Sequence, residues 1–339
     1  MKSAIGKTIF TGSAAALLVS DRSTTLFTDG RYIAQAKEEV KNARIVIGTK
    51  APILQAAEWL ASQRRRRSGR STVTLGIEAE SLTAGARARL ASALRGKARL
   101  RFAPPLVERA RMLKDAHELA LIREAVKLGA SLFPIARRKI RPGVPEVEVA
   151  AAMEYEARRK GAEGMSFPTI LASGARSAVV HGRASTAPIP PRGFVVCDFG
   201  VILAGYCSDR TRTVHVGQPS REAREFYGAV LQAQQAAIAA VRSGVNAADV
   251  DEAARSVLRK RKLARWFTHS TGHGVGLEIH EGPRLAARQS QKLQAGMVVT
   301  IEPGAYVPGK WGVRIEDVVV VTDSGCEVLT PADKDLIIV

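Results

Sequence analysis

The sequence contains a repeat with a spacing of about 100 residues, and this repeat limits the folds open to the chain. Arg141-Pro-Gly-Val144 recurs as Arg242-Ser-Gly-Val245, 101 residues later. Gly193-Phe-Val-Val-Cys-Asp198 recurs as Gly296-Met-Val-Val-Thr-Ile-Glu302, with one inserted residue. So long a period indicates two matching halves of one domain rather than a solenoid. Two halves related by a pseudo-twofold axis would form a pocket between them, and each half would supply carboxylates to it.

Each half of the repeat is predicted to contain two helices followed by strands, because helical apolar spacing gives way to continuous apolar runs. The expected helices are 115–138, 145–160, 222–241 and 246–262, and the expected strands are 166–171, 194–201, 206–216, 297–302 and 313–321. Pro145 suits the first turn of its helix, and Asn246 with Asp249 resembles a capping box.

The residues before the repeat are predicted to form a smaller α/β domain. Strands are expected at 14–19, 25–28, 45–47 and 73–77, and helices at 53–60 and 82–94. The segment Arg101-Phe-Ala-Pro-Pro-Leu106 interrupts this pattern with two prolines, which indicates a boundary. Since 339 residues are too many for one ordinary compact domain, we expect two domains, at 1–105 and 108–339.

Two aspartates in the first half are expected to lie close together. Asp198 ends the apolar run 194–197, and Asp209 ends the segment Gly205-Tyr-Cys-Ser-Asp209, which follows a tight turn. A hairpin would return both carboxylates to one neighbourhood. Because two carboxylates in a low-dielectric site repel each other, a bound cation is the simplest way to keep both there.

The second half repeats this arrangement and adds an imidazole. Glu302 ends the apolar run 297–301, and Glu316 precedes the apolar run 318–321. Four carboxylates predict an oxygen-rich site for divalent ions. His273, within a glycine-rich segment, makes Mn, Co, Fe or Zn more suitable than Ca or Mg.

Two further histidines are candidates for the same pocket. His280 follows His273 by seven residues, which would place the two on opposite faces of a strand, so this segment is predicted to be irregular. His181 ends another apolar run. Any one of these residues alone would more commonly be structural, but their order on a duplicated scaffold favours a shared site.

The chain is strongly basic, with 51 Lys and Arg against 32 Asp and Glu and a net charge of +19. Such a balance can indicate a nucleic-acid partner. Here the excess is mostly arginine and occurs along the chain, and the one dense run, Arg64–Arg67, has no aromatic neighbours. We therefore expect a solvated loop at this run and no nucleic-acid partner.

Cysteine usage and hydropathy favour a cytoplasmic protein. The three cysteines Cys197, Cys207 and Cys326 are too few, and odd in number, for a disulfide framework, and no CxxC pair is present. No apolar run is long enough to span a bilayer. Met1-Lys2-Ser3 does not open a secretory signal.

Five segments resemble the aminopeptidase P, prolidase and methionine aminopeptidase superfamily, peptidase family M24. They are Cys197-Asp-Phe-Gly200, Tyr206-Cys-Ser-Asp-Arg-Thr-Arg-Thr213, His273-Gly-Val-Gly-Leu-Glu-Ile-His-Glu281, Thr300-Ile-Glu-Pro-Gly304 and Gly312-Val-Arg-Ile-Glu-Asp317. The likeness spans about 108–339 and implies an α+β pita-bread fold, whose duplicated halves surround a curved antiparallel sheet.

The residues before this region resemble the creatinase-like N-terminal domain of the Xaa-Pro aminopeptidase and prolidase branch. Phe27-Thr-Asp-Gly-Arg-Tyr32 and Arg111-Met-Leu-Lys-Asp115 carry that likeness. Family N-domains usually begin with a helix and a strand before the stretch seen here at Phe10–Ser13. Only nine residues precede Phe10, so the domain is expected to be shortened at its start.

The resemblance also implies roles for individual residues and a substrate class. Asp198, Asp209, His273, Glu302 and Glu316 would bind two divalent ions, of which Mn²⁺ is the expected one and Co²⁺, Zn²⁺ and Fe²⁺ are alternatives. Asp209 and Glu316 would bridge both ions, Asp198 would bind one, and His273 and Glu302 the other. The substrates would be peptides or dipeptides with proline at the second position, and the enzyme would be a homodimer.

Four residues would act on the substrate rather than only on the ions. Glu302 would also take the proton of the attacking water, and His181 and His280 would contact the substrate and stabilise the tetrahedral intermediate. Arg314 would orient the ligands or the intermediate.

Three other readings of the sequence remain open. Some relatives keep this scaffold as a non-catalytic interaction module, although they typically lack metal ligands, whereas all five positions are filled here. A creatinase-like hydrolase would work without metal, and a methionine-type aminopeptidase would cleave Met-Ala peptides.

Overall fold

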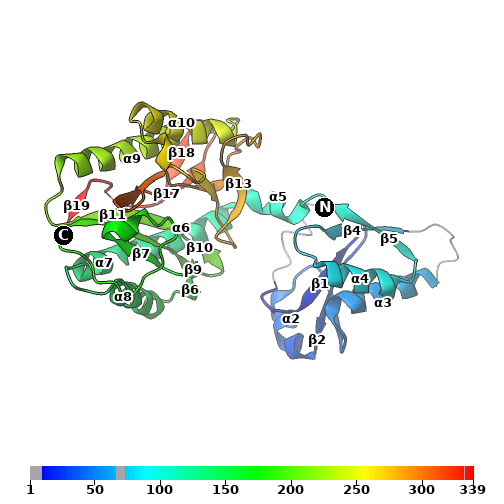
Figure 1. Cartoon of the computed structure of the whole chain (residues 1–339). Coiled ribbons are helices and arrows are strands. Elements are labelled where there is room, and N and C mark those ends of the chain that lie inside the picture. The colour runs from blue at the N-terminus through cyan, green and yellow to red at the C-terminus, as the bar shows by residue number, and fades with distance from the viewer. Residues whose placement is uncertain (1–9, 66–72, 332) are drawn as a thin grey trace. The chain divides into compact units, whose positions relative to one another are not determined.

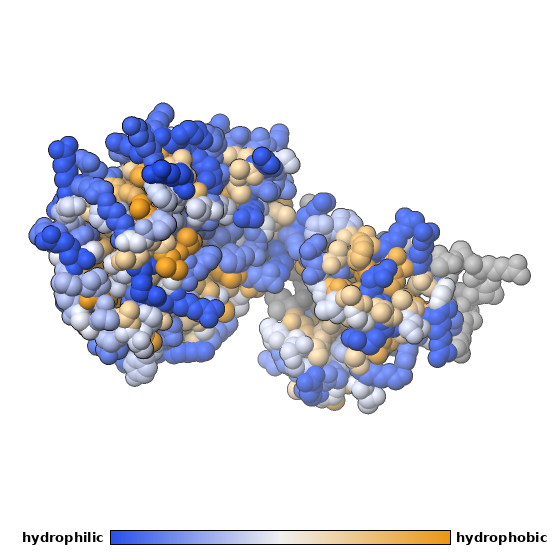
Figure 2. Space-filling model, viewed as in Figure 1, coloured by the Kyte–Doolittle hydropathy of each residue, from blue (hydrophilic) through white to orange (hydrophobic). Residues whose placement is uncertain are grey.

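The structure is a computed structural model, which describes residues 10–65, 73–331 and 333–339. The chain divides into two compact units, Met1–Arg111 and Met112–Val339 (Figure 1). On the face that Figure 2 shows, hydrophilic residues cover most of each unit and hydrophobic residues form separate patches. Among the described residues, no helix combines the length and apolarity that crossing a bilayer would require.

The first unit contains two small sheets covered by helices. Strands β1 (Ala15–Val19), β2 (Thr24–Asp29) and β3 (Arg44–Gly48) form one sheet, and β4 (Val73–Glu78) pairs in parallel with β5 (Ala98–Ala103). The helices are α2 (Ile33–Glu39), α3 (Pro52–Arg65), α4 (Ala84–Leu94) and α5 (Leu106–Met112), with the 3-10 turn η1 (Gly30–Tyr32) before α2. All strands and helices expected here are present within a few residues of their predicted bounds.

Sequence reasoning was wrong in this unit at two places. β5 occupies part of the segment interpreted as a break, because charged Arg99 and Arg101 alternate with Leu100 and hide an amphipathic strand. Helix α3 continues through Arg64 and Arg65, where a loop was expected. The rest of that arginine run, Arg66–Arg67, and the chain start Met1–Ser3 lie outside the described residues.

The second unit begins with three helices. They are α6 (Ala116–Ala130), α7 (Phe133–Lys139) and α8 (Glu146–Arg159). Asp115 and Glu118 form a capping box at the start of α6. The single helix predicted at 115–138 is wrong, because the chain breaks at Ser131, whose hydroxyl donates to the carbonyl of Leu128, and Pro134 begins a new helix.

Strands then complete the first half of the repeat. They are β6 (Gly164–Met165), β7 (Ile170–Ser173), β8 (Gly193–Phe199), β9 (Val201–Leu203), β10 (Tyr206–Cys207) and β11 (Arg210–Val216), with the 3-10 turn η2 (Gly174–Ala178) after β7. The strand predicted at 166–171 begins only at Ile170, because Pro168 cannot donate to a sheet ladder. The strands predicted at 194–201 and 206–216 are each interrupted near an aspartate, at Gly200 and at Ser208–Asp209.

The second half follows the same order. Its helices are α9 (Arg221–Ala240) and α10 (Ala247–Lys260), with the 3-10 turn η3 (Ala264–Trp266) after α10. Its strands are β12 (Gly272–Gly274), β13 (Glu281–Leu285), β14 (Val298–Ile301), β15 (Gly304–Val307), β16 (Trp311–Arg314), β17 (Asp317–Val321), β18 (Cys326–Val328) and β19 (Ile337–Ile338). The strand predicted at 313–321 is interrupted at Ile315–Glu316.

The capping box predicted at the start of α10 is also wrong. Asn246 is the N-cap residue, but its side chain accepts no backbone hydrogen bond. Instead, its amide nitrogen Nδ2 donates to Oδ2 of Asp249 over 3.2 Å.

The two halves repeat one another in detail. β8 pairs antiparallel with β11, β14 pairs antiparallel with β17, and each pair encloses a shorter one, β9 with β10 and β15 with β16. In the two turns before α8 and α10, Gly143 and Gly244 have φ values of +84° and +87°, which glycine adopts without strain. Their amides donate to Ile189 and Leu293, each over 2.9 Å. The duplicated pita-bread architecture is therefore confirmed.

Each half has its own apolar core between helices and strands. In Figure 1, α9 and α10 lie on one side of the strands β11 and β17, while α7 and α8 lie on the other. One core cluster joins α9 and α10 to β14 and β17, and another joins α7 and α8 to β8. The strands between these layers carry the acidic residues of the repeat.

Candidate metal centre

The five residues predicted to bind metal lie at the ends of paired strands. Asp198 lies in β8 and Asp209 immediately before β11, while Glu302 follows β14 and Glu316 precedes β17. His273 lies in β12, which pairs with β14. The segment from His273 to His280 was predicted to be irregular, and this is confirmed: the strand register shifts between His273 and Gly274, and residues 275–280 form no strand.

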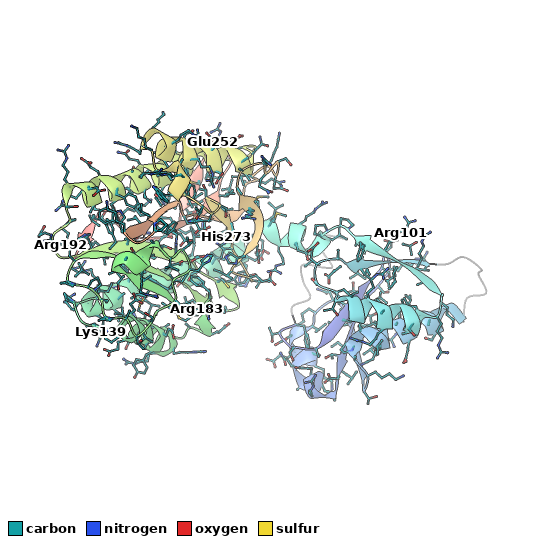
Figure 3. All side chains as sticks on the ribbon, viewed as in Figure 1. Arg101, Lys139, Arg183, Arg192, Glu252 and His273 are labelled. Atoms are coloured by element: carbon teal, nitrogen blue, oxygen red, sulfur yellow. The ribbon has the colours of Figure 1, made fainter. Side chains whose placement is uncertain are left out.

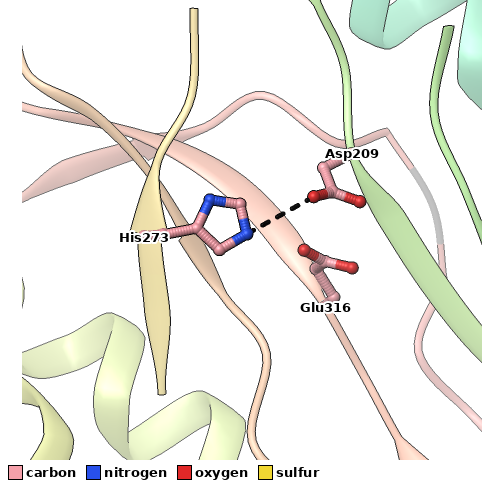
Figure 4. A group of neighbouring side chains, drawn as sticks. All are labelled: Asp209, His273 and Glu316. Carbon is pink, nitrogen blue, oxygen red and sulfur yellow. Dashed lines mark ion pairs between the residues drawn. The ribbon is translucent and has the colours of Figure 1, made fainter. Parts of the chain in front are cut away.

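Three of the five side chains lie in direct reach of one another, and a fourth, Glu302, lies beside one of them, His273. Ligand atoms of Asp209, His273 and Glu316 all lie within 4.8 Å of one another (Figure 4). His273 Nε2 lies 3.6 Å from Asp209 Oδ2 and 3.4 Å from Glu302 Oε1. The hairpins and the glycine-rich strand therefore converge on one point, as their repeat suggested.

Asp198, the fifth residue, borders this group. Its Oδ2 accepts a hydrogen bond of 2.5 Å from Arg314 Nη2, and its negative charge raises the pKa values of Asp209, Glu302 and Glu316.

The electrostatics of the group are unfavourable without a cation. Burial raises the pKa of Asp209 well above its usual value, and Glu316 raises it further. Burial likewise raises the pKa of Glu302 to about 8 and that of Glu316 well above its usual value. Burial therefore keeps protons on a group of acids that would repel one another if all were ionised.

The buried atoms fit a divalent cation. Oδ1 of Asp198 and Oε1 of Glu316 are buried and have no hydrogen-bond partner among the described residues. His273 Nδ1 lies 3.0 Å from the carbonyl of Gly274, so Nδ1 carries the hydrogen and the Nε2 lone pair faces the carboxylates. Burial lowers the pKa of His273 to about 4. A neutral imidazole and unpartnered oxygens are the donors a divalent transition metal uses.

Hydroxyls from neighbouring strands hold these donors in place. Thr211 Oγ1 donates to Glu316 Oε2 over 2.7 Å. Thr300 Oγ1 donates to Glu302 Oε1 over 3.3 Å and accepts from the backbone amide of His273 over 3.0 Å. Such second contacts orient metal ligands.

Arg314 links the acidic group to an aromatic side chain. Besides Asp198, the guanidinium donates to Tyr306 Oη over 2.6 Å and to Thr211 Oγ1 over 3.1 Å. Arg314 is buried. These hydrogen bonds fix the position of the Arg314 guanidinium, so a positive charge lies beside the acidic group.

The two other predicted histidines differ in position. The His280 ring lies 4.4 Å from the His273 ring, edge to face, and its residue is exposed. His181 is exposed on the segment after η2. Partial burial of the imidazole, followed by the charge of His181, lowers the pKa of His280.

Sequence reasoning missed a histidine and a tyrosine that belong to the same network. His269 Nδ1 lies 2.8 Å from the carbonyl of Ser270, so it carries the hydrogen, and Nε2 accepts from Tyr306 Oη over 2.9 Å. Burial, followed by Arg314, lowers the pKa of His269 to about 3. The available signals were weak: His269 lies four residues before His273, and Tyr306 lies between two of the predicted ligands.

Sequence comparisons match both units of the chain to known families. The profile described as Metallopeptidase family M24 matches residues 120–323. The profile described as Creatinase/Prolidase N-terminal domain matches residues 7–113.

Individual relatives and solved structures agree with these matches. "Uncharacterized peptidase YqhT" of Bacillus subtilis (strain 168) is 39% identical over 97% of this chain and 91% of its own length. The structure titled Xaa-Pro dipeptidase from Bacillus anthracis has a TM-score of 0.92 at 39% identity, over 97% of this chain and 90% of that one. The structure of an X-Pro aminopeptidase from Thermotoga maritima MSB8 has a TM-score of 0.88 at 35% identity, over 99% and 94%.

The family brings with it divalent metal ions, which the buried donors described above fit. Together with the duplicated fold, the matches show that this chain is a hydrolase of metallopeptidase family M24, in the branch of prolidases and Xaa-Pro aminopeptidases.

Proposed function

We propose that this enzyme hydrolyses the first peptide bond of dipeptides and longer peptides that carry proline at the second position. Two similar structures bear the names Xaa-Pro dipeptidase and X-Pro aminopeptidase, which supports this substrate class. The observation that carries the proposal is the convergence of Asp209, His273 and Glu316 within 4.8 Å. Bound divalent ions would explain why these buried acids and the imidazole lie so close together.

Two divalent ions are proposed to occupy the group. Asp209 and Glu316 would bridge both, Asp198 would bind one, and His273 with Glu302 would bind the other. We propose Mn²⁺ as the native metal, because mixed carboxylate and imidazole donors suit it, and Co²⁺, Zn²⁺ or Fe²⁺ as substitutes. Two such ions supply an activated water at neutral pH and positive charge for the developing oxyanion.

The chain's own residues would then carry the proton and orient the substrate. Glu302 is proposed as the general base, since its Oε1 lies 3.4 Å from Nε2 of His273, beside the other proposed ligands. His280 and His181 are proposed to donate hydrogen bonds to the substrate where negative charge grows.

Arg314 is proposed to fix Asp198 and Tyr306. Its hydrogen bonds to both side chains support this positioning role. Tyr306 accepts a hydrogen bond from Arg314 and donates one to His269. The three side chains therefore form a continuous chain of hydrogen bonds, and Arg314, at one end of it, also donates to Asp198.

The test is a peptide panel with purified protein loaded with Mn²⁺ or Co²⁺. It should contain Xaa-Pro dipeptides, longer Xaa-Pro peptides and Met-Ala peptides, and each should be assayed with the wild type and with Glu302→Ala. We expect turnover of Xaa-Pro bonds by the wild type and almost none by the variant. If metal-loaded, folded protein cleaves no Xaa-Pro bond, the proposal is wrong, and turnover of Met-Ala alone would indicate a methionine-type enzyme.

A homodimer in the cytoplasm completes the proposal. The branch and the absence of a disulfide framework in the sequence support these two points. Sedimentation of the metal-loaded protein should give twice the chain mass of 36.3 kDa, and a monomer would contradict the first of them.

A further inference from the structure

A hollow on the surface of the second unit lies between α7 and α8. It encloses about 600 Å³, which is within the range of small-molecule sites. Pro134, Ile135 and Ala152 contribute apolar surface to it, and the ring of Tyr155, which is 64% exposed, stands at its wall. None of the residues that line the hollow belongs to the metal centre, and Figure 3 labels Lys139 on this part of the unit and His273 elsewhere.

The basic residues of this region fall into two groups. Three that do not line the hollow but lie close in sequence to its lining residues are engaged by the protein: Arg158 donates to backbone carbonyls at the end of α8, Arg141 does so at the end of α7, and Arg159 pairs with Glu156 over 3.0 Å. Since Arg159 neutralises Glu156, the acid that lines the hollow does not offset the remaining cations.

The second group lines the hollow without such partners. Arg138 and Lys139 are exposed, and among the described residues neither forms an ion pair or a side-chain hydrogen bond. Lys160, also exposed, donates only to the hydroxyl of Ser131, over 3.1 Å. Three positive charges therefore face the hollow with no carboxylate to neutralise them.

The repeat gives an internal comparison for these residues. Positions 101 residues apart are equivalent: α8 and α10 both end in the same backbone conformation, at Lys160 and Arg261 with φ −88° and ψ 5°. The hydrogen bond from Lys160 to Ser131 recurs as one from Arg261 to Gln232 over 2.8 Å. The two helix pairs thus have one shared scaffold.

Lys160 therefore belongs to the shared scaffold, but three other side chains that face the hollow do not. The positions equivalent to Arg138, Lys139 and Tyr155 are Ala239, Ala240 and Ser256. Helix α9 has no basic residue in its last turn, yet it ends at the same place in the motif as α7. Arg138, Lys139 and the exposed ring of Tyr155 are therefore not required to end these helices or to pack them.

From this difference we infer that the α7–α8 hollow binds a nucleoside phosphate. Arg138, Lys139 and Lys160 would contact the phosphate oxygens as charge-assisted donors. The face of Tyr155 would stack on the base, as aromatic side chains do with nucleobases. The apolar floor from Pro134 to Ala152 suits the ring system rather than a bare inorganic anion.

The experiment is calorimetric titration of the Mn²⁺-loaded protein with ATP, GTP, CTP and UTP, beside adenosine and inorganic tripolyphosphate. The test variant takes its residues from the other half of the repeat: Arg138→Ala, Lys139→Ala and Tyr155→Ser, which the equivalent helices already accommodate. The control variant, Arg224→Ala with Lys260→Ala, removes the same number of positive charges from exposed positions of α9 and α10. Far-UV circular dichroism and thermal melting establish that both variants are folded.

We expect at least one nucleotide to bind the wild type more tightly than tripolyphosphate does, and adenosine to bind weakly. Nucleotide affinity should fall at least tenfold in the triple variant and change less than twofold in the control. The single variant Tyr155→Ser should weaken nucleotide binding without changing tripolyphosphate binding. Absence of nucleotide binding would overturn the inference, and so would equal binding by the wild type and the triple variant, which would place the ligand elsewhere, such as at the metal centre.

Discussion

Arg314 donates a hydrogen bond of 2.5 Å to one carboxylate oxygen of Asp198, while the other oxygen is buried without a hydrogen-bond partner among the described residues. The guanidinium therefore fixes the orientation of this carboxylate and leaves one oxygen available to a cation. Asp198 lies in β8 and Arg314 at the end of β16, so this hydrogen bond joins the two halves of the repeat.

Replacing Arg314 by Lys should impair catalysis. A lysine cannot keep the hydrogen bonds to Asp198, Tyr306 and Thr211 at once. Since a hydrogen bond to a charged group contributes roughly 1.5–3 kcal/mol, we expect kcat/KM for an Xaa-Pro dipeptide to fall about 10- to 100-fold. The half-buried Arg123, which pairs with Glu327 away from the metal centre, gives the control Arg123→Lys, and a loss of similar size there would contradict the role of Arg314.

Removing the hydroxyl of Tyr306 should lower kcat, whereas removing that of Tyr227 should lower only the stability of the fold. Tyr306→Phe leaves Nε2 of His269 and one arm of Arg314 without their partner, so kcat should fall about tenfold, on the order of one charge-assisted hydrogen bond. Tyr227 is a buried tyrosine outside the centre, whose hydroxyl donates to the carbonyl of Lys334 over 2.8 Å.

The matched variant Tyr227→Phe should lower the free energy of unfolding by about 1 kcal/mol and keep kcat. Steady-state kinetics measure kcat, and denaturant unfolding measures stability. If kcat falls in Tyr227→Phe but not in Tyr306→Phe, the hydrogen bonds of Tyr306 do not contribute to catalysis.

Metal affinity should increase as the pH rises from 6 to 8. In the metal-free protein, burial raises the pKa of Glu302 to about 8 and raises those of Asp209 and Glu316. These acids must lose their protons to bind a cation, so binding releases protons. Titration of Mn²⁺ in buffers of different ionisation enthalpy should show that release, and an affinity independent of pH would contradict the raised pKa values.

The same shifts predict how the stability of the metal-free protein depends on pH. A carboxylate with a raised folded-state pKa binds more protons in the folded than in the unfolded state, so the stability that it contributes is present at low pH and is lost as pH rises toward the folded pKa. For Glu302 this window runs from about its ordinary value of 4.5 to about 8. Adding Mn²⁺ should remove the loss, because the cation favours the ionised form, and melting curves at pH 5 and pH 8 with and without metal measure it.

Two buried acids outside the metal centre, Glu146 and Asp251, should contribute to the free energy of unfolding and not to catalysis. Glu146 accepts from the amide and hydroxyl of Ser173, each over 2.8 Å, and Asp251 accepts from the amide and hydroxyl of Thr271 in the second half. Glu146→Ala would leave these donors and Arg176 without their acceptor, so we expect a loss of about 3–5 kcal/mol in the free energy of unfolding.

The exposed Glu148 on the same helix provides the comparison, because exposed charges contribute little. Glu148→Ala should change the free energy of unfolding by less than about 1 kcal/mol. Equal losses in urea unfolding of the two variants would show that the buried hydrogen bonds of Glu146 contribute nothing beyond those of a surface acid.

The sequence was sufficient for the parts of the site that the repeat encodes. Asp198 and Glu302 end matching apolar runs, and Asp209 and Glu316 come after them in the same two halves, so the convergence of these acids could be predicted from the sequence. The apolar runs also indicated most strands, because continuous hydrophobic segments between glycines have few alternatives.

Other features depend on contacts that no local pattern encodes. His269 joins the network only because the fold brings Tyr306 to it, over 37 residues of sequence. The break before α7 and the uncapped Asn246 reflect local hydrogen bonding to Leu128 and Asp249, which compete with the expected helix signals. Strand β5 was missed because its arginines obscured the apolar period.

The central claim is that acids from two repeated hairpins, with one imidazole, hold two divalent ions. The most direct measurement is the number of Mn²⁺ ions bound per chain by metal-free wild type and by Glu316→Ala, determined by equilibrium dialysis with elemental analysis. The account predicts two ions per chain for the wild type and a loss of tight binding at both positions in the variant. Fewer than two ions in the wild type, or an unchanged count in folded Glu316→Ala, would contradict it.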